Sequence, residues 1–281
     1  MTNSNLSPRI GFMQGRLCDL VDGRIQAFPW DDWQKEFPVA RSLGVRLMEW
    51  TLDHDRLYEN PIMNEEGRTA ILSLCREHGL FIPSLTGDLF MQAPFYKAKG
   101  SEREQLVSDM QNVLEACRRI QCKFICIPLV DDGRLEDRAM EDGLVAEMKN
   151  VRPFLVEHGL GIVFESDYQP GELNRFIRRL DEACFGVNLD TGNSAAFGFK
   201  CREELALYTD RILNVHIKDR LPDFGTTVPL GAGVAEIGET IRGLEEAGYT
   251  GNYILQTARA EDGDHAGAVA RYGAMVQDWL G

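Results

Sequence analysis

The chain has 281 residues, of which 44% are hydrophobic, so it can bury a large core as one domain of about 250 residues or as two smaller ones. Its formal net charge of −14 disfavours nucleic acid and anionic membranes as partners, because both are held largely by Lys and Arg side chains. No apolar run reaches the roughly 20 residues of a membrane-spanning helix, and the N-terminal segment does not resemble a signal peptide. We therefore expect a cytoplasmic protein that binds neither nucleic acid nor membranes.

Eight short runs of apolar and β-branched residues predict strands, and amphipathic stretches between them predict helices. Four helical stretches run into a glycine and then an apolar residue, which is typical of a helix that ends in a left-handed residue before the next strand. These glycines are Gly44, Gly79, Gly159 and Gly248. The expected strands are residues 9–14, 46–51, 81–86, 124–128, 161–166, 185–190, 212–218 and 252–257. The expected helices are residues 33–43, 64–78, 101–120, 143–158, 171–183, 202–210, 235–247 and 266–280.

Eight strand-helix units of about 35 residues each predict an α/β fold, namely a single (β/α)8 TIM barrel over residues 1–281. A doubly wound open sheet is the alternative, and it is disfavoured because no G-x-G-x-x-G follows the first strand. The longest irregular stretches, residues 15–30, 87–100 and 219–234, follow the first, third and seventh strands. Loops after strands form the active face of such a barrel, so these three should border a pocket.

Four consecutive strands end in a side chain that can bind a metal ion. These side chains are Glu165, Asp190, His216 and Gln256. Neighbouring barrel strands bring their ends together, so the four should converge. Two carboxylates, an imidazole and an amide oxygen suit Mn²⁺, Mg²⁺, Co²⁺ or Zn²⁺ and leave positions open for substrate oxygens. Each residue alone also fits a structural role, such as a helix cap or a rim hydrogen bond, but their common position favours a metal site.

Further polar side chains lie at or just beyond the predicted strand ends. Lys218 could stabilise negative charge on a reacting oxygen or hold a phosphate, with an ion pair at the strand end as the alternative. Arg16 and Glu49 follow or end the first two strands, where they could hydrogen-bond sugar hydroxyls or form a rim salt bridge with each other. Arg259 and His265 follow the last strand and are the nearest candidates for an anion contact and for an additional acid/base group.

Five segments resemble the xylose-isomerase-like barrel superfamily of sugar and sugar-phosphate isomerases and epimerases. They are Val-Phe-Glu165, Asn-Leu-Asp190-Thr-Gly-Asn193, Val-His216-Ile-Lys218-Asp219, Val-Pro-Leu-Gly231-Ala-Gly233 and Tyr-Thr-Gly-Asn-Tyr-Ile-Leu-Gln256. The resemblance spans essentially the whole barrel and is strongest in the last four strands. It implies metal ligands at Glu165, Asp190 and His216, with a glutamate on the last strand as the fourth. We assign Asn193, in the second segment, to substrate binding.

Gln256 departs from that pattern, because it stands where the family has a glutamate. In the family's epimerases, carboxylates on the fifth and eighth strands exchange protons with opposite faces of the substrate, and an amide has no usable pKa for this role. Glu165 remains as a single base. The sequence therefore predicts a divalent-metal-dependent isomerase or epimerase-like enzyme that acts on a sugar, a sugar phosphate or a related polyol through an enediolate.

Two alternatives stay open. The chain could be a weakly catalytic or non-catalytic carbohydrate-binding barrel, since Gln256 removes one of the family's acids, or a dehydratase or lyase for a cyclitol or sugar acid. An endonuclease for abasic DNA on the same fold is disfavoured by the charge of −14 and by the presence of only five histidines. A homo-oligomer is compatible with this kind of barrel.

Overall fold

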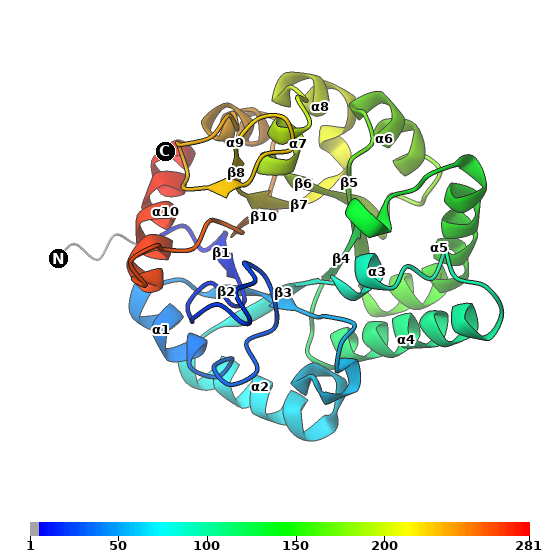
Figure 1. Ribbon diagram of the computed structural model, residues 1–281, viewed down its shortest axis with the longest axis horizontal. Coiled ribbons are helices and arrows are strands. Elements are labelled where there is room, and N and C mark those ends of the chain that lie inside the picture. The colour runs from blue at the N-terminus through cyan, green and yellow to red at the C-terminus, as the bar shows by residue number, and fades with distance from the viewer. Residues whose placement is uncertain (1–5) are drawn as a thin grey trace. The chain divides into compact units, whose positions relative to one another are not determined.

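The computed structural model describes residues 6–281, and its main strands form a closed barrel. The predicted α/β barrel is confirmed, and each of the eight predicted strands is present (Figure 1). In the order in which hydrogen-bonded neighbours follow one another, the strands are β1 (Ile10–Met13), β10 (Asn252–Leu255), β7 (Ile212–Ile217), β6 (Phe185–Asp190), β5 (Gly161–Ser166), β4 (Phe124–Leu129), β3 (Phe81–Thr86) and β2 (Leu47–Thr51).

The chain divides into two compact units, and strands β2, β3 and β6 each have residues in both. The single domain expected from the sequence stays a prediction. The first unit comprises residues 1–49, 74–81 and 188–281, and the second comprises residues 50–73 and 82–187. Among the described residues, no helix is long and apolar enough to cross a membrane. The cytoplasmic location stays a prediction as well.

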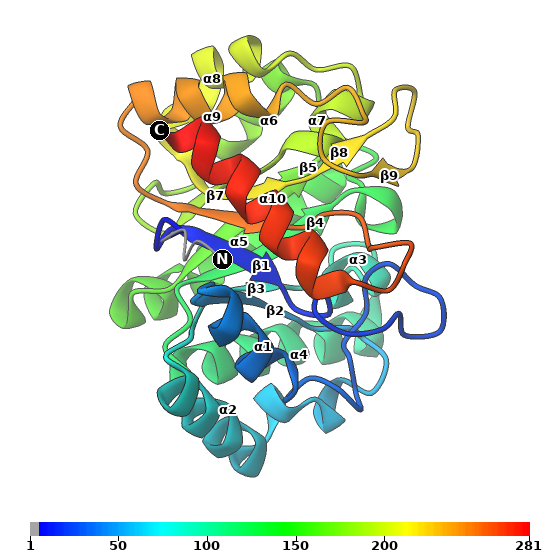
Figure 2. The same ribbon diagram turned by 90° about the vertical axis from the view of Figure 1, so that its left-hand side faces the viewer.

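In the first unit, strands β1, β10 and β7 pair in parallel register. Helix α10 (His265–Leu280) lies against β1 and β10, as Figure 2 shows, and packs against α1 (Glu36–Leu43) and α9 (Ile237–Glu246). Helix α9 buries an apolar stripe of Ile237, Ile241 and Leu244, as its helical spacing requires. The unit also contains α7 (Thr191–Ala196), α8 (Cys201–Tyr208), the 3-10 turn η4 (Thr209–Arg211) and the hairpin strands β8 (Asp219–Arg220) and β9 (Thr227–Val228).

In the second unit, strands β4 and β5 pair in parallel along their whole length. Both are buried almost throughout, which explains why their sequences read as continuous apolar runs rather than alternating ones. The helices of this unit are α3 (Leu89–Gln92), α4 (Gly100–Arg119), α5 (Arg138–His158) and α6 (Pro170–Ile177), with the 3-10 turns η1 (Leu57–Glu59), η2 (Pro61–Met63) and η3 (Asp131–Gly133). Helix α2 (Glu65–His78) has residues in both units.

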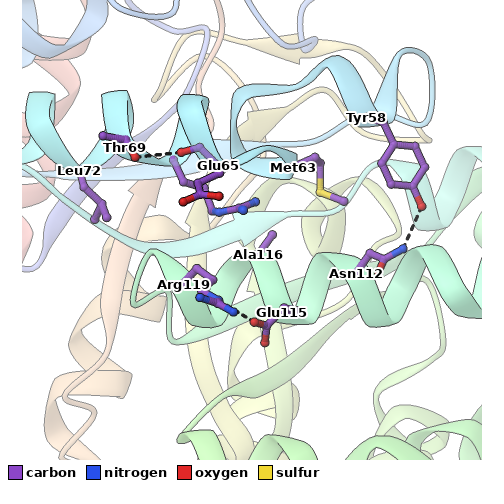
Figure 3. A pocket seen from close by; sticks show the side chains of 10 residues that line it. Tyr58, Met63, Glu65, Thr69, Leu72, Asn112, Glu115, Ala116 and Arg119 are labelled. Carbon is purple, nitrogen blue, oxygen red and sulfur yellow. Dashed lines mark hydrogen bonds and ion pairs between the residues drawn. The ribbon is translucent and has the colours of Figure 1, made fainter.

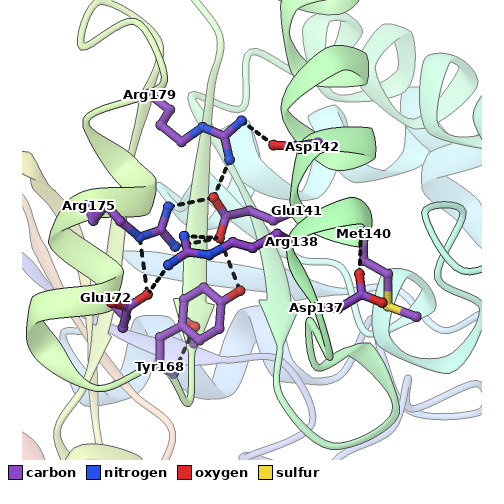
Figure 4. A network of polar contacts seen from close by, with 10 residues as sticks. Asp137, Arg138, Met140, Glu141, Asp142, Tyr168, Glu172, Arg175 and Arg179 are labelled. Carbon is purple, nitrogen blue, oxygen red and sulfur yellow. Dashed lines mark hydrogen bonds and ion pairs between the residues drawn. The ribbon is translucent and has the colours of Figure 1, made fainter.

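A buried carboxylate joins the two helices that flank strand β5 along the chain (Figure 4). Glu141 of α5 has no exposed surface and accepts hydrogen bonds from Arg175 of α6 at 2.7 and 2.5 Å. Arg179 also donates to Glu141, and the hydroxyl of Tyr168 lies 3.2 Å from it. Burying a charge is costly unless it is paired and hydrogen-bonded, so this cluster fixes how the chain leaves β5 and enters α6.

The four glycines predicted to end helices do so with left-handed backbone. The φ angles of Gly44, Gly79, Gly159 and Gly248 are 75°, 68°, 65° and 80°. Helix α5 begins five residues before its predicted start, because the side chain of Asp137 caps it by accepting from the backbone N–H of Met140. Helix α6 ends six residues earlier than predicted.

The loops after the strands contain more structure than predicted. The short helices α3 and α7 and the hairpin β8–β9 follow β3, β6 and β7 respectively. Strands β7 and β10 end one and two residues earlier than predicted, so Lys218 and Gln256 lie just beyond them. Lys218 leaves the strand ladder because its N–H donates to the hydroxyl of Thr191 at 3.0 Å.

Glu36 organises the loop after β1 from inside the protein. Its carboxylate has no exposed surface and accepts hydrogen bonds from the backbone N–H groups of Gly15 at 2.8 Å and Leu17 at 3.0 Å. Burial raises the pKa of Glu36 to about 7, although these two backbone hydrogen bonds oppose the rise. The protonated form of Glu36 is therefore favoured by folding.

We expect Glu36→Gln to remove part of the pH dependence of stability. The folded-state pKa lies above the ordinary value of 4.5, so this contribution is fully present below that pH and is lost as the pH rises through about 7. Each unit of pKa shift corresponds to about 1.4 kcal/mol. Urea unfolding at several pH values between 4.5 and 8 measures it, with Glu246→Gln on the exposed face of α9 as the control. Parallel curves for wild type and Glu36→Gln would contradict this interpretation.

Candidate active site

Asp190 is the last residue of β6 and also the N-cap of α7. Its Oδ1 accepts from the backbone N–H groups of Gly192 at 2.9 Å and Asn193 at 2.8 Å. Its Oδ2 accepts from Nζ of Lys218 at 3.2 Å, and the Asp190 side chain is only 1% exposed. The residues that follow Asp190 are thus the start of a helix. One oxygen of Asp190 caps this helix, and the other faces a cation.

Lys218 also connects Asp190 to Gln256. Nζ of Lys218 also donates to Oε1 of Gln256 at 3.2 Å, so the ion pair considered for Lys218 is present and includes a third residue. Nε2 of Gln256 donates to Oε1 of Gln26 at 2.8 Å, and the same oxygen accepts from Nη2 of Arg16 at 3.3 Å. Because Gln26 takes the amide N–H, the carbonyl oxygen of Gln256 is directed toward Lys218.

Four buried side chains form a closed ring of hydrogen bonds around His216. Nε2 of His216 lies 2.6 Å from Oε1 of Glu49, and Nδ1 lies 2.9 Å from Nδ2 of Asn188. Nδ2 of Asn214 donates to Oε2 of Glu49 and to Oδ1 of Asn188, both at 2.9 Å. None of the four side chains has appreciable exposed surface.

The ring determines which nitrogen of His216 carries the proton. An amide nitrogen only donates, so Nδ1 of His216 accepts from Asn188 and Nε2 donates to the carboxylate of Glu49. Both ring nitrogens of His216 are thus used within the ring, so a metal ion could bind His216 only if one of these two hydrogen bonds were broken. A ring nitrogen of His216 and a carboxylate oxygen of Asp190 lie within 4.8 Å of each other, which is close enough for one ion to contact both.

We expect Glu49→Gln to disrupt this ring although it preserves shape. Asn214 presents the same nitrogen to both of its partners, so three amides and a neutral imidazole cannot satisfy all four contacts in either direction. One buried contact is lost, which should lower the free energy of unfolding by about 1–3 kcal/mol, or else His216 takes up a second proton.

Long-range ¹H–¹⁵N NMR of the imidazole nitrogens and urea unfolding test this together. Wild type should give a single Nε2–H tautomer, and Glu246→Gln serves as the matched exposed control. Unchanged nitrogen shifts and stability in Glu49→Gln would mean that Glu49 does not set the state of His216.

Glu165 is the fifth of the six residues of β5 and is 7% exposed. It lies in the second unit, whereas Asp190, His216 and Gln256 lie in the first. Its role as base and metal ligand stays a prediction. Asn193, on α7, uses its Oδ1 to accept from Nη1 of Arg220 at 2.7 Å. Its role in substrate binding also stays a prediction.

Residues 37–276 match the pattern of the family described as xylose isomerase-like TIM barrel. The chain belongs to the xylose isomerase-like TIM barrel family. L-ribulose-5-phosphate 3-epimerase UlaE of Salmonella typhi is 23% identical over 258 residues, which cover 88% of this chain and 88% of that protein. The resemblance inferred from the strand-end segments is therefore confirmed at the level of the family.

Solved structures of two similar proteins share the fold. One is a D-allulose 3-epimerase from Methylomonas sp. in complex with D-allulose, with a TM-score of 0.73, 13% identity and 96% of each chain covered. The other is the IolI protein with a bound zinc atom, with a TM-score of 0.75, 13% identity, and 97% of this chain and 98% of that chain covered. At such identities the likeness concerns the fold of this xylose isomerase-like barrel alone.

Two arginines predicted to contact the substrate donate hydrogen bonds to loops of the barrel. Nε of Arg16 donates to the carbonyl of Thr257 at 2.9 Å, and Arg259 donates to the carbonyls of Gly15 and Cys18. These contacts tie the loop after β10 to the loop after β1. Burial lowers the pKa of Arg259. Binding of substrate by either arginine stays a prediction.

His265 lies at the first position of α10. Its Nδ1 accepts from the backbone N–H of Ala260 at 3.3 Å, and its Nε2 lies 3.7 Å from Asp19. Burial and then the nearby charge of Arg259 lower its pKa. His265 therefore has an environment that favours the neutral imidazole, and its predicted role at the substrate stays open to test.

Asp219 accounts for the Gly-x-Gly turn that follows β9. Its carboxylate accepts from the backbone N–H groups of Gly231 at 2.8 Å, Gly233 at 3.0 Å and Ala235 at 3.0 Å. A Cβ atom on Gly233 would lie 2.2 Å from Oδ1 of Asp219, so no other residue fits there. Both glycine N–H groups of the turn donate to this carboxylate, so the turn is a tight loop closed by Asp219.

Three residues of the candidate site were not predicted from the sequence, namely Asn188, Asn214 and Gln26. Asn188 and Asn214 each precede a predicted ligand by two residues, and alternate residues of a strand face the same side, so this spacing was the available signal. Gln26 lies in an irregular loop, where no periodicity indicates a partner.

The cavities found within the individual units lie elsewhere. A groove of about 490 Å³ lies between α2 and α4 and is bordered by Tyr58, Glu65 and Arg119 (Figure 3). A smaller cavity of about 260 Å³ adjoins α7 and α8 and is lined in part by Glu204, whose pKa is raised by burial to about 7. Neither is lined by a predicted site residue.

Proposed function

We propose that this protein is an isomerase or epimerase for a sugar, a sugar phosphate or a related polyol. The observation that carries the proposal is the approach of Asp190 and His216 within 4.8 Å at the ends of two strands of a xylose isomerase-like barrel. The named relatives support the substrate class, because one is an L-ribulose-5-phosphate 3-epimerase and another is a D-allulose 3-epimerase in complex with its sugar.

The donor set fits a divalent ion. Asp190, His216 and Gln256 would hold it with a carboxylate oxygen, an imidazole nitrogen and an amide oxygen, and Glu165 would be the fourth ligand. His216 would first have to give up one of its two ring hydrogen bonds, to Asn188 or to Glu49. Such oxygen and nitrogen donors suit Mn²⁺, Mg²⁺, Co²⁺ or Zn²⁺, and the zinc in the IolI structure supports metal binding on this fold. A bound ion would polarise the substrate carbonyl and lower the cost of forming an enediolate.

Within this proposal, Glu165 removes the proton from the carbon beside the carbonyl. Lys218 carries a positive charge 3.2 Å from Oδ2 of Asp190, and it would stabilise the negative charge that develops on the substrate oxygen. Gln256 cannot accept a proton, so the return of the proton also falls to Glu165 in a one-base isomerisation. The loops after β1 and β7 would shield this chemistry from water.

Glu165→Gln should lower turnover by about 10²- to 10⁴-fold, the usual contribution of a positioned base, while the protein stays folded. The measurement is deuterium incorporation from D₂O beside the carbonyl of D-allulose, L-ribulose 5-phosphate and related ketoses. Glu157→Gln, an exposed change on α5, is the control. Exchange at the wild-type rate in Glu165→Gln would remove Glu165 from the mechanism.

Gln256→Glu should tighten Mn²⁺ binding by about tenfold or more, because it adds a negative charge beside the ion. It could also restore a second base and introduce slow proton exchange on the opposite face of a ketose. Calorimetric titration with Mn²⁺ measures the first effect and deuterium labelling the second. Equal affinity in both proteins would mean that Gln256 is not a ligand.

A non-catalytic carbohydrate-binding barrel is the second candidate, and the contact of the Gln256 amide with Lys218 favours it over an intact two-base enzyme. Saturable sugar binding with no isotope exchange for any ketose would identify it. A dehydratase or lyase would instead release water or a carbonyl fragment from a cyclitol or sugar acid, which product analysis detects.

A further inference from the structure

The Lys218 ammonium lies where cation-binding atoms converge. It donates to Oδ2 of Asp190 and to Oε1 of Gln256, each at 3.2 Å. These are the atoms through which the two side chains would bind a divalent ion, because Oδ1 of Asp190 caps α7 and Nε2 of Gln256 donates to Gln26. A cation from the protein itself therefore takes two of the oxygens that the proposed metal site needs.

The backbone and its neighbours direct Lys218 to this position. Its N–H donates to the hydroxyl of Thr191 at 3.0 Å, and that hydroxyl lies 2.7 Å from the carbonyl of Lys218. Its stem passes over Gly192, where an added Cβ would lie 2.7 Å from Cγ of Lys218. The chain thus has a glycine at a point where a side chain would displace this lysine.

The neutral side chain of Gln256 is compatible with the positive charge of Lys218 next to Asp190. With Lys218 in contact, the negative charge of Asp190 is balanced and Gln256 adds none, so these three groups together carry no net charge. A divalent ion entering here gains little attraction from them and meets the repulsion of the ammonium. A glutamate at position 256 would add a negative charge to the set.

We propose that Lys218 is the resident cation of this site and competes with a divalent ion for Oδ2 of Asp190 and Oε1 of Gln256. A divalent ion then binds only when the Lys218 side chain moves away, which its flexible stem and 14% exposure allow. The displaced ammonium stays within reach of the site and can contact an oxygen of the substrate. This inference rests on the metal site of the proposed function.

The test is a titration of the metal-free protein with Mn²⁺. Calorimetry and the EPR signal of free Mn²⁺ measure the binding. Lys218→Met keeps the length of the stem and removes the charge, so it should bind Mn²⁺ at least about tenfold more tightly than wild type. Lys149→Met is the matched control, because Lys149 is an exposed lysine on helix α5 of the second unit. Its affinity should equal that of wild type.

Lys218→Gln repeats the test with a polar side chain, and circular dichroism checks that each variant is folded. Mn²⁺ affinity that is unchanged or weaker in both Lys218 variants would overturn the inference and leave the proposed function standing. No Mn²⁺ binding by wild type or any variant would overturn the metal site itself and the inference with it. Tighter binding in the Lys218 variants without turnover by wild type would retain the inference and remove the isomerase activity.

Discussion

The constraint on which the candidate site depends is the burial of the Glu49 carboxylate inside the barrel. A carboxylate without exposed surface is tolerated only when donors surround it, and His216 and Asn214 supply two of them. Because the donors are themselves bonded to Asn188, every side chain in the ring has one permitted orientation. The position of the proton on His216 is therefore fixed before any ligand binds to the site.

Asp190 divides its two oxygens between fold and chemistry. One oxygen satisfies the first N–H groups of α7, which would otherwise lack partners, and the other meets Lys218. The short helix α7 therefore keeps the carboxylate in place even when the charge in front of it changes. Lys218, held by Thr191 beside it, can then move without loosening the strand end from which it comes.

Much of this arrangement was accessible from the sequence. Apolar runs and helix-ending glycines predicted the eight strands, and the position of Asp190 and His216 at strand ends predicted that they would lie together. The ring partners Asn188 and Asn214 were missed, although their two-residue spacing from Asp190 and His216 indicates a common face. Gln26 could not be predicted, because its contact with Gln256 joins an irregular loop to a residue just beyond β10, 230 residues away.

The contact between Gln26 and Gln256 has a consequence for the evolution of the barrel. Oε1 of Gln26 accepts from both Gln256 and Arg16, so a carboxylate introduced at position 256 would face an acceptor. An ancestor with glutamate there would have needed a different residue, or a turned amide, at position 26. The two positions are therefore expected to show epistasis, with each substitution tolerated best when the other is also present. A library varied at both positions would reach combinations whose single substitutions are each unfavourable.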